Sequence, residues 1–220
     1  MSGSKPPANH PCQLRVEGQD DLFVIAGLLA RHGLTFPDAA WYPLIAPMDS
    51  VDQLLPTIPL EMKSTTPRVG FVLDADTSVA DRWRQVRGRC AKVGVELEEQ
   101  PHEGGTIIEI GNRRRGFWLM PDNVAPGALE DFLSSLVPTD DALWPIAQKC
   151  TAEALEAGAP IGEGQRSKGH IHTWLAWQER PGMPFGTALT AEVLGKDGRI
   201  ATRFLEWVRQ LFGAGDGVSP

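Results

Sequence analysis

VGFVLDAD, residues 69–76, is the stretch that decides the fold of this chain. Its first five residues form a continuous apolar run, which predicts a β-strand buried on both faces. The run stops abruptly at Asp74-Ala75-Asp76, and Thr77 or Ser78 then begins a helix that we expect to extend to about Val93. A buried strand, an acidic turn and a helix in this order indicate one unit of a parallel α/β sheet.

A similar unit lies upstream of this stretch. Residues 13–16 (QLRV) predict a strand that ends at Glu17, and residues 20–32 predict the helix that follows it. The proline-rich segment after that helix predicts only a strand near 41–45 and a short helix at 50–55. The order of elements is therefore again strand, acid, helix.

Downstream, two further apolar runs predict strands at 106–110 (TIIEI) and 116–120 (GFWLM). The second run ends at Asp122, and residues 127–136 predict a helix that stops before a proline. Strands that alternate with helices in this way predict the α/β class, with a mostly parallel, Rossmann-like sheet flanked by helices.

The second half of the chain has a different pattern, because it predicts helices only, at 140–158, 170–179 and 200–212. We therefore expect an α/β domain at 12–138 and a C-terminal helical extension at 139–212 that packs on it. Residues 1–11 and 213–220 are rich in Pro, Gly and Ser and predict flexible tails.

Composition excludes several classes of protein. The chain has 220 residues and a net charge of −7, so it is not a basic coat protein of nucleic acid. Cys12, Cys90 and Cys150 lie far apart without a CxxC pair, which argues against a disulfide framework and a zinc knuckle. Without an apolar run of about 20 residues or a secretory signal, we expect a soluble cytoplasmic protein and no membrane partner.

Acidic residues follow three of the predicted strands: Glu17, the pair Asp74 and Asp76, and Asp122. The carboxyl ends of parallel strands meet at one edge of a sheet, and residues i and i+2 of an extended backbone point to the same side. We therefore expect these carboxylates to lie close together, where a divalent cation would relieve their repulsion. Oxygen-only ligands favour Mg²⁺ or Mn²⁺, and the chemistry that suits this site is cleavage of phosphodiesters or phosphoanhydrides.

The alternative is that acids after strands serve as turn and helix-capping residues. This alternative holds well for any single residue, including Asp20, Asp21, Glu130 and Asp131 at the starts of two predicted helices. For the whole set, the abrupt ends of the apolar runs favour a metal site.

Taken together, the segments VEGQDD, VGFVLDADTSVADRW, GFWLMPDNVAPGALEDFL and HTWLAWQ resemble a known family. They resemble the Toprim domain over residues 13–136, and over most of the chain they resemble small stand-alone Toprim proteins related to the OLD-family nucleases. The resemblance implies that Glu17 is a general acid/base and that Asp74 and Asp76 hold Mg²⁺. It further implies that extra acids hold a second ion, and these are Asp122, Glu130 and Asp131.

The resemblance also implies nucleic acid, most readily DNA, as the partner. The chain has no GxxxxGK[ST] loop, so an ATPase of the kind that accompanies OLD nucleases would have to act in trans. Tyr42 is the only tyrosine and lies in the proline-rich segment, so a topoisomerase nucleophile is not indicated. The oligomeric state stays open.

Basic residues are candidates for contacts to phosphate. Arginines crowd the helix after Asp76, from Arg82 onward, and Arg113–Arg115 precede a strand; we interpret both groups as solvated, on a helix face and in a turn. Lys168, His172 and Asp21 are candidate substrate-binding residues.

In the same region, His170, Trp174 and Trp177 share one helical face, as expected of a helix that docks on the sheet through buried tryptophans. A His-x-His pair cannot chelate zinc from one helical face.

The sequence thus predicts a Mg²⁺- or Mn²⁺-dependent nuclease or related phosphoryl-transfer enzyme, with water as nucleophile. The alternative is a non-catalytic Toprim-fold module that binds nucleic acid or protein in recombination, repair or phage defence.

Overall fold

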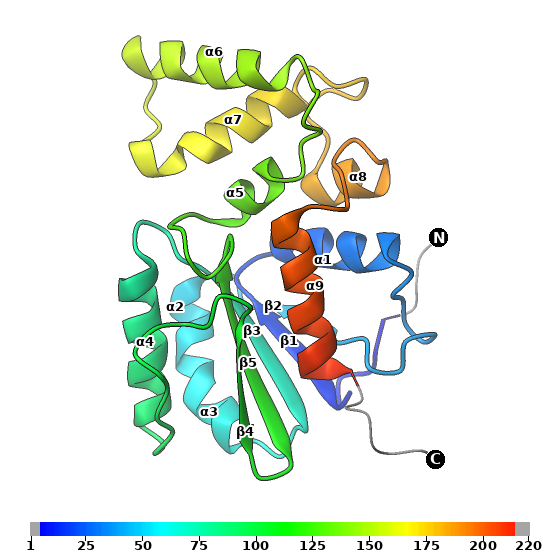
Figure 1. Cartoon of the computed structure of the whole chain (residues 1–220), viewed down its shortest axis with the longest axis vertical. Coiled ribbons are helices and arrows are strands. Elements are labelled where there is room, and N and C mark those ends of the chain that lie inside the picture. The colour runs from blue at the N-terminus through cyan, green and yellow to red at the C-terminus, as the bar shows by residue number, and fades with distance from the viewer. Residues whose placement is uncertain (1–4, 214–220) are drawn as a thin grey trace.

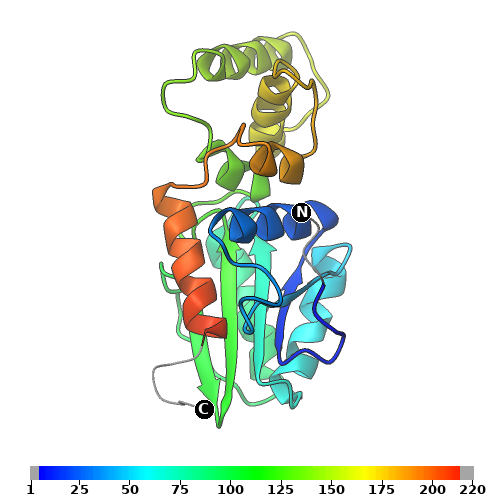
Figure 2. The ribbon, with the colours of Figure 1, turned by 90° about the vertical axis from the view of Figure 1, so that its right-hand side faces the viewer.

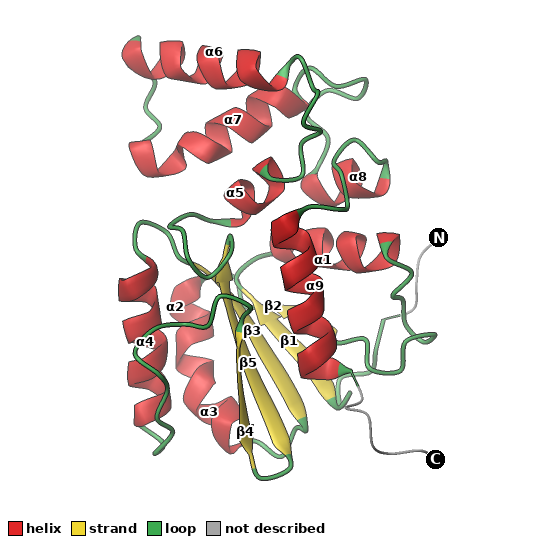
Figure 3. Cartoon of the chain, in the orientation of Figure 1, coloured by secondary structure: helices red, strands yellow, loops and turns green. Residues whose placement is uncertain are grey.

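A five-stranded sheet in the order β2-β1-β3-β5-β4 forms the centre of the computed structural model, which describes residues 5–213. Figure 3 shows its strands as one twisted layer between helices. Parallel pairing joins β2 (Leu44–Pro47), β1 (Cys12–Val16), β3 (Arg68–Asp74) and β5 (Arg113–Met120). Only the edge strand β4 (Thr106–Ile110) runs antiparallel, against β5. The predicted fold class is confirmed.

The two central strands explain why the VGFVL run is continuous. Val69, Phe71, Val72 and Leu73 are each 0% exposed, because helices cover both faces of β3. On one face, Phe71 stacks on Phe117 of β5 with ring centroids 5.3 Å apart. The register places Asp74 opposite Met120, so the last residue of each central strand lies at the same edge of the sheet.

Helices cover both faces of the sheet (Figures 1 and 2). One hydrophobic core joins the sheet to α1 (Gln19–Arg31) and α9 (Arg199–Phe212). A second core joins the opposite face to the group of helices α2 (Val51–Leu54), η1 (Leu55–Thr57), α3 (Ile58–Lys63) and α4 (Val79–Ala91).

The remaining helices lie beyond the carboxyl edge of the strands, at the top of Figure 1. They are α5 (Leu129–Ser134), α6 (Trp144–Glu156), η2 (Glu163–Gln165), α7 (Arg166–Leu175) and α8 (Phe185–Thr190). The α7 helix packs on α5 and α6, and α8 packs on α1. Within residues 5–213, no helix has the length and apolarity needed to cross a bilayer.

Several local predictions were wrong. Arg113–Arg115 belong to β5 rather than to a turn, and Arg115 is 0% exposed because its guanidinium donates to backbone carbonyls, among them that of Glu61 at 2.8 Å. Its side chain therefore anchors the loop after α3 instead of facing solvent. Trp174 is buried as predicted, but Trp177 is 41% exposed because α7 ends at Leu175.

Two α-helices and the short 3₁₀ helix η2 were not predicted. Both α3 and α8 are six residues long, and both have a proline at or just before their first turn, which resembles a loop in the sequence. The helix at the C-terminus was predicted within one residue, and it lies against β3 and β5 as one layer of the α/β fold.

The predicted tails fall partly outside the described residues, which exclude 1–4 and 214–220. Within 5–11, Pro6 and His10 are buried, and His10 Nδ1 lies 3.1 Å from the carbonyl oxygen of Cys12. This part of the chain therefore packs beside the start of β1.

Candidate functional site

The carboxyl edge of the sheet brings Glu17 and Asp74 together. Glu17 follows β1, and Asp74 is the last residue of the adjacent strand β3. Glu17 Oε1 accepts a hydrogen bond from the backbone N–H of Asp74 at 2.9 Å, although the two residues are 57 positions apart in the sequence. The parallel pairing of β1 with β3 is what places them side by side.

Asp74 lies in a group of buried and half-buried carboxylates. Burial raises the pKa of Asp74 well above its ordinary value, and the negative charges of Asp21, Glu17 and Glu130, and last that of Asp76, raise it further. One of its oxygens, Oδ1, accepts a hydrogen bond from the backbone N–H of Leu129 at 3.1 Å. The end of β1 and residues of α1, β3 and α5 thus bring four carboxylates close together, and we call this group the acidic cluster: Glu17, Asp21, Asp74 and Glu130.

Two further members of the acidic cluster have raised pKa values. Burial raises the pKa of Glu17 to about 7, against the opposing effects of the Asp74 N–H and the positive charge of Arg82. Burial likewise raises the pKa of Asp21 to about 6, although its Oδ2 accepts the N–H of Gly18 at 2.9 Å. Asp21, predicted as a substrate-binding residue, therefore lies among the acids themselves.

A lysine from another helix neutralises part of this charge. Lys168 Nζ of α7 lies 3.1 Å from Glu130 Oε1 of α5, with the lysine side chain 54% exposed and the glutamate side chain 12% exposed. The hydrogen bond to Glu130 raises the pKa of Lys168. His172, the other basic candidate, is exposed and packs its ring on Phe185 of α8, with centroids 4.9 Å apart.

Asp76 departs from the expectation that it would share a side with Asp74. Its φ of 52° takes the backbone out of the extended conformation on which that expectation rested. Its carboxylate forms an ion pair with Arg82 of α4, whereas the Asp74 carboxylate contacts the first residue of α5. The two aspartates of the DAD turn therefore contact different elements.

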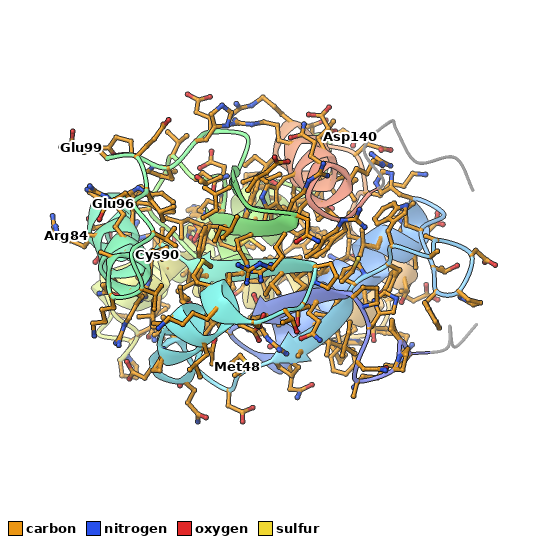
Figure 4. All side chains as sticks on the ribbon, turned by 90° about the horizontal axis from the view of Figure 1, so that it is seen from below. Met48, Arg84, Cys90, Glu96, Glu99 and Asp140 are labelled. Atoms are coloured by element: carbon orange, nitrogen blue, oxygen red, sulfur yellow. The ribbon has the colours of Figure 1, made fainter. Side chains whose placement is uncertain are left out.

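Arg82 is a residue of this site that we had interpreted as solvated. Its side chain is only 8% exposed, whereas that of Arg84, two positions further along α4, is 73% exposed. Figure 4 shows Arg84 on the outer side of α4 and Cys90 on the side toward the sheet. The burial of Arg82 could have been predicted from its spacing. It precedes the apolar residues Val86 and Cys90 by four and eight positions, so all three lie on the same face of the helix.

Asp122 and Asp131 each accept hydrogen bonds from nearby backbone. Asp122 Oδ1 accepts the N–H groups of Val124 at 3.1 Å and Ala125 at 2.8 Å, which closes the turn after β5. Asp131 Oδ2 accepts the N–H of Ala128 at 2.8 Å at the start of α5, and its Oδ1 accepts the hydroxyl of Ser167. These are the turn and capping roles of the alternative interpretation.

The donor chemistry of the acidic cluster fits a hard cation. Among residues 5–213, no three His, Cys, Asp or Glu side chains are arranged to hold a metal ion together. Mg²⁺, however, keeps several waters and commonly takes only one or two protein carboxylates. In the described part of the chain, Asp74 Oδ2 and Glu17 Oε2 accept no hydrogen bond, so each residue has an oxygen available in a buried, negatively charged site.

Comparisons with known proteins place the chain in a family. Residues 11–213 match the family described as "Protein of unknown function (DUF3226)", and the chain belongs to it. No curated protein matches the chain. Two solved structures of the C-terminal region of the OLD protein from Xanthomonas campestris pv. campestris, one phased with mercury and one with iodine, are similar at 13% identity and a TM-score of 0.47. The similarity covers 91% of this chain and 95% and 94% of those chains, respectively.

Proposed function

We propose that this protein is a Mg²⁺- or Mn²⁺-dependent phosphodiester hydrolase of the Toprim type. The observation that carries the proposal is the acidic cluster, in which Asp74 is surrounded by three other carboxylates at the carboxyl edge of a parallel sheet. Ligands of open α/β sheets bind at this edge.

The reason lies in the repulsion between the four carboxylates. Buried like charges are costly, and they are relieved either by protons or by a cation. The raised pKa values of Glu17 and Asp21 indicate that, without a cation, the cluster retains protons close to neutral pH. A divalent cation replaces these protons, so its binding releases protons and weakens as the pH falls.

Distinct roles follow for the residues of the cluster. Asp74, with its available Oδ2, would hold the cation together with Asp21, the neighbour whose charge acts on it most strongly. When bound, a divalent cation stabilises charge on a phosphoryl group and lowers the pKa of water. Glu17, with a pKa of about 7 and an available Oε2, would take a proton from the attacking water and return it to the leaving oxygen.

Lys168 fits the recognition of substrate phosphate. Its half-exposed ammonium lies next to Glu130, at the boundary between the acidic cluster and solvent. A phosphate that entered the site would meet this positive charge first. We propose nucleic acid, most readily DNA, as the substrate, and an ATPase in trans as a partner, since the motifs resemble those of OLD-related proteins.

A non-catalytic binding module is the second candidate, and a specific observation favours it. Asp76, Asp122 and Asp131 already have partners in the fold, namely Arg82 and the backbone of two turns. Three of the predicted metal ligands therefore act as structural residues. If the acidic cluster served only to bind a partner, Asp76, Asp122 and Asp131 would be needed only for the structural contacts that they already make.

Metal-dependent turnover distinguishes the two candidates. Purified protein is incubated with end-labelled single-stranded DNA, duplex DNA or RNA, with Mn²⁺, Mg²⁺ or EDTA. We expect Mn²⁺-dependent cleavage that is lost in Glu17→Gln and in Asp74→Asn. Glu99→Gln is the matched control, since Glu99 is exposed and lies at the outer surface of the molecule (Figure 4). Binding of these substrates without cleavage in any condition would instead favour the module.

A further inference from the structure

We propose that Arg82 is a positioning residue that keeps Asp76 as its own counter-ion, so that the two aspartates of the DAD turn have different tasks. In this arrangement Asp74 faces the cation, and Asp76 holds the turn in place without binding the cation. The inference rests on the proposed function, because it concerns the ligands of the same site.

The hydrogen bonds of Arg82 connect it to both aspartates of the DAD turn. Its Nε donates to the carbonyl oxygen of Asp74 at 2.7 Å, its Nη2 pairs with the Asp76 carboxylate, and its Nη1 donates to Gln85 Oε1 at 2.9 Å. One guanidinium thus joins both aspartates of the turn to α4. A planar guanidinium is suited to this task, because its N–H groups have a fixed geometry that a lysine ammonium lacks.

The burial of the Arg82 side chain explains why it needs Asp76 as a partner. The Arg82 side chain is 8% exposed, and a cation buried to this degree requires a charged partner. Within residues 5–213, Asp76 is the carboxylate that pairs with it. The Asp76 side chain is itself 59% exposed. If its carboxylate turned to a metal ion, the buried guanidinium of Arg82 would lose that partner.

Backbone hydrogen bonds also hold Asp76 in place. Asp76 N–H donates to the Gly127 carbonyl at 2.9 Å, and Gly127 N–H donates to the Asp76 carbonyl at 2.7 Å. This pair of bonds joins the DAD turn to the loop before α5. With backbone and side chain both held, Asp76 connects α4 to the α5 loop, whereas the Asp74 carboxylate accepts the N–H of Leu129 in α5.

A double-mutant cycle measures the division of tasks. Mn²⁺ affinity is followed by electron paramagnetic resonance for the wild type, Asp74→Asn, Asp76→Asn, Arg82→Gln and the double variant Arg82→Gln/Asp76→Asn. We expect Asp74→Asn to weaken binding at least about tenfold, as is common when groups that support a metal are lost. Asp76→Asn should change the affinity less than about threefold in the wild type and far more in Arg82→Gln, because there Asp76 is released.

A second cycle in EDTA tests the ion pair without metal. Asp76→Asn should lower the urea midpoint of unfolding when Arg82 is present and should not lower it in Arg82→Gln. Arg84→Gln is the matched control: Arg84 is exposed and pairs with Asp81 on the same helix, so its effect should add to that of Asp76→Asn. If Arg82→Gln fails to fold, Arg82→Met replaces it, because methionine also removes the charge and has an apolar side chain that suits a buried position.

Two results would overturn the inference: a loss of Mn²⁺ affinity in Asp76→Asn as large as in Asp74→Asn, or additive effects of Asp76 and Arg82 on the urea midpoint. A wild-type protein that binds no Mn²⁺ would refute the proposed function instead. In that case the cycle in EDTA still decides whether Asp76 belongs to Arg82.

Discussion

The Glu17 carboxylate accepts the backbone N–H of Asp74 across 2.9 Å, and this bond joins the ends of β1 and β3. It lowers the pKa of Glu17, but burial has the larger and opposite effect, so the pKa is raised to about 7. The bond fixes one oxygen of the carboxylate, and within residues 5–213 the other oxygen, Oε2, accepts no hydrogen bond. A group held in this way titrates near neutral pH, which makes its behaviour measurable.

The first prediction concerns the stability of the metal-free protein against pH. The pKa of Glu17 rises from 4.5 to about 7 on folding, so its favourable contribution is complete below about pH 4.5 and is lost as the pH rises through 7. The loss is on the order of 3 kcal/mol, because each pKa unit corresponds to about 1.4 kcal/mol. Urea unfolding in EDTA should therefore show stability that falls between about pH 5 and about pH 7.

Asp21 contributes a slope of the same sign, since its pKa is also raised, from 3.8 to about 6. Glu17→Gln should reduce the slope without abolishing it, whereas the exposed control Glu99→Gln should leave it unchanged. A stability that rises over this window in the wild type would show that Glu17 is not held in a buried environment.

The second prediction concerns Asp74→Asn. An asparagine keeps an oxygen that can accept the N–H of Leu129, while it removes an acid whose ionised form is disfavoured by burial and by its neighbours' charges. In EDTA the variant should therefore melt at a higher temperature than the wild type. Added Mg²⁺ should raise the melting temperature of the wild type more than that of the variant. A lower melting temperature in EDTA would identify Asp74 as a structural cap of α5.

Much of this site was predictable because it depends on topology. An apolar run that ends in an acid predicts a strand end, and parallel pairing then brings Glu17 and Asp74 to one edge. The position of Asp76 was not predictable in this way, because it depends on a left-handed backbone and on a buried arginine. Neither has a local signal as strong as a run of apolar residues.

The same contrast explains the misassigned arginines. Arg113–Arg115 have the composition of a solvated turn. Arg115 can be buried because it donates to carbonyl groups at the end of α3 and just after it, at sequence separations of 54 and 51. Burial lowers the pKa of Arg115 to about 10, yet it remains charged at neutral pH. Partners that distant in sequence cannot be read from the local pattern.

The third prediction concerns Lys168. Its removal leaves Glu130 without its ammonium partner and increases the negative charge near Asp74. Lys168→Ala should therefore be stabilised by added Mg²⁺ more than the wild type is, in a thermal melt at low ionic strength. Lys149→Ala is the control, because Lys149 is an exposed lysine of α6 that pairs with Glu153 on its own helix. An equal response of both variants would show that Lys168 does not act on the acidic cluster.

The fourth prediction concerns the close approach of α9 to the sheet. Gly116 of β5 lies beside Gly70 of β3, and a Cβ at position 116 would lie 2.5 Å from Leu211 Cδ2. Leu211 is 0% exposed, so it cannot move aside into solvent. Gly116→Ala should therefore lower the free energy of unfolding by roughly 1–3 kcal/mol, as overpacking of a core does.

Gly88→Ala provides the opposite case with the same chemical change. Gly88 lies within α4, and a Cβ there would have nothing within 4 Å. Alanine favours the helical backbone over glycine by about 1 kcal/mol, so Gly88→Ala should raise the free energy of unfolding in the same urea titration. If both variants shifted the free energy of unfolding in the same direction, the close packing of α9 on the sheet would not depend on the glycines of β3 and β5.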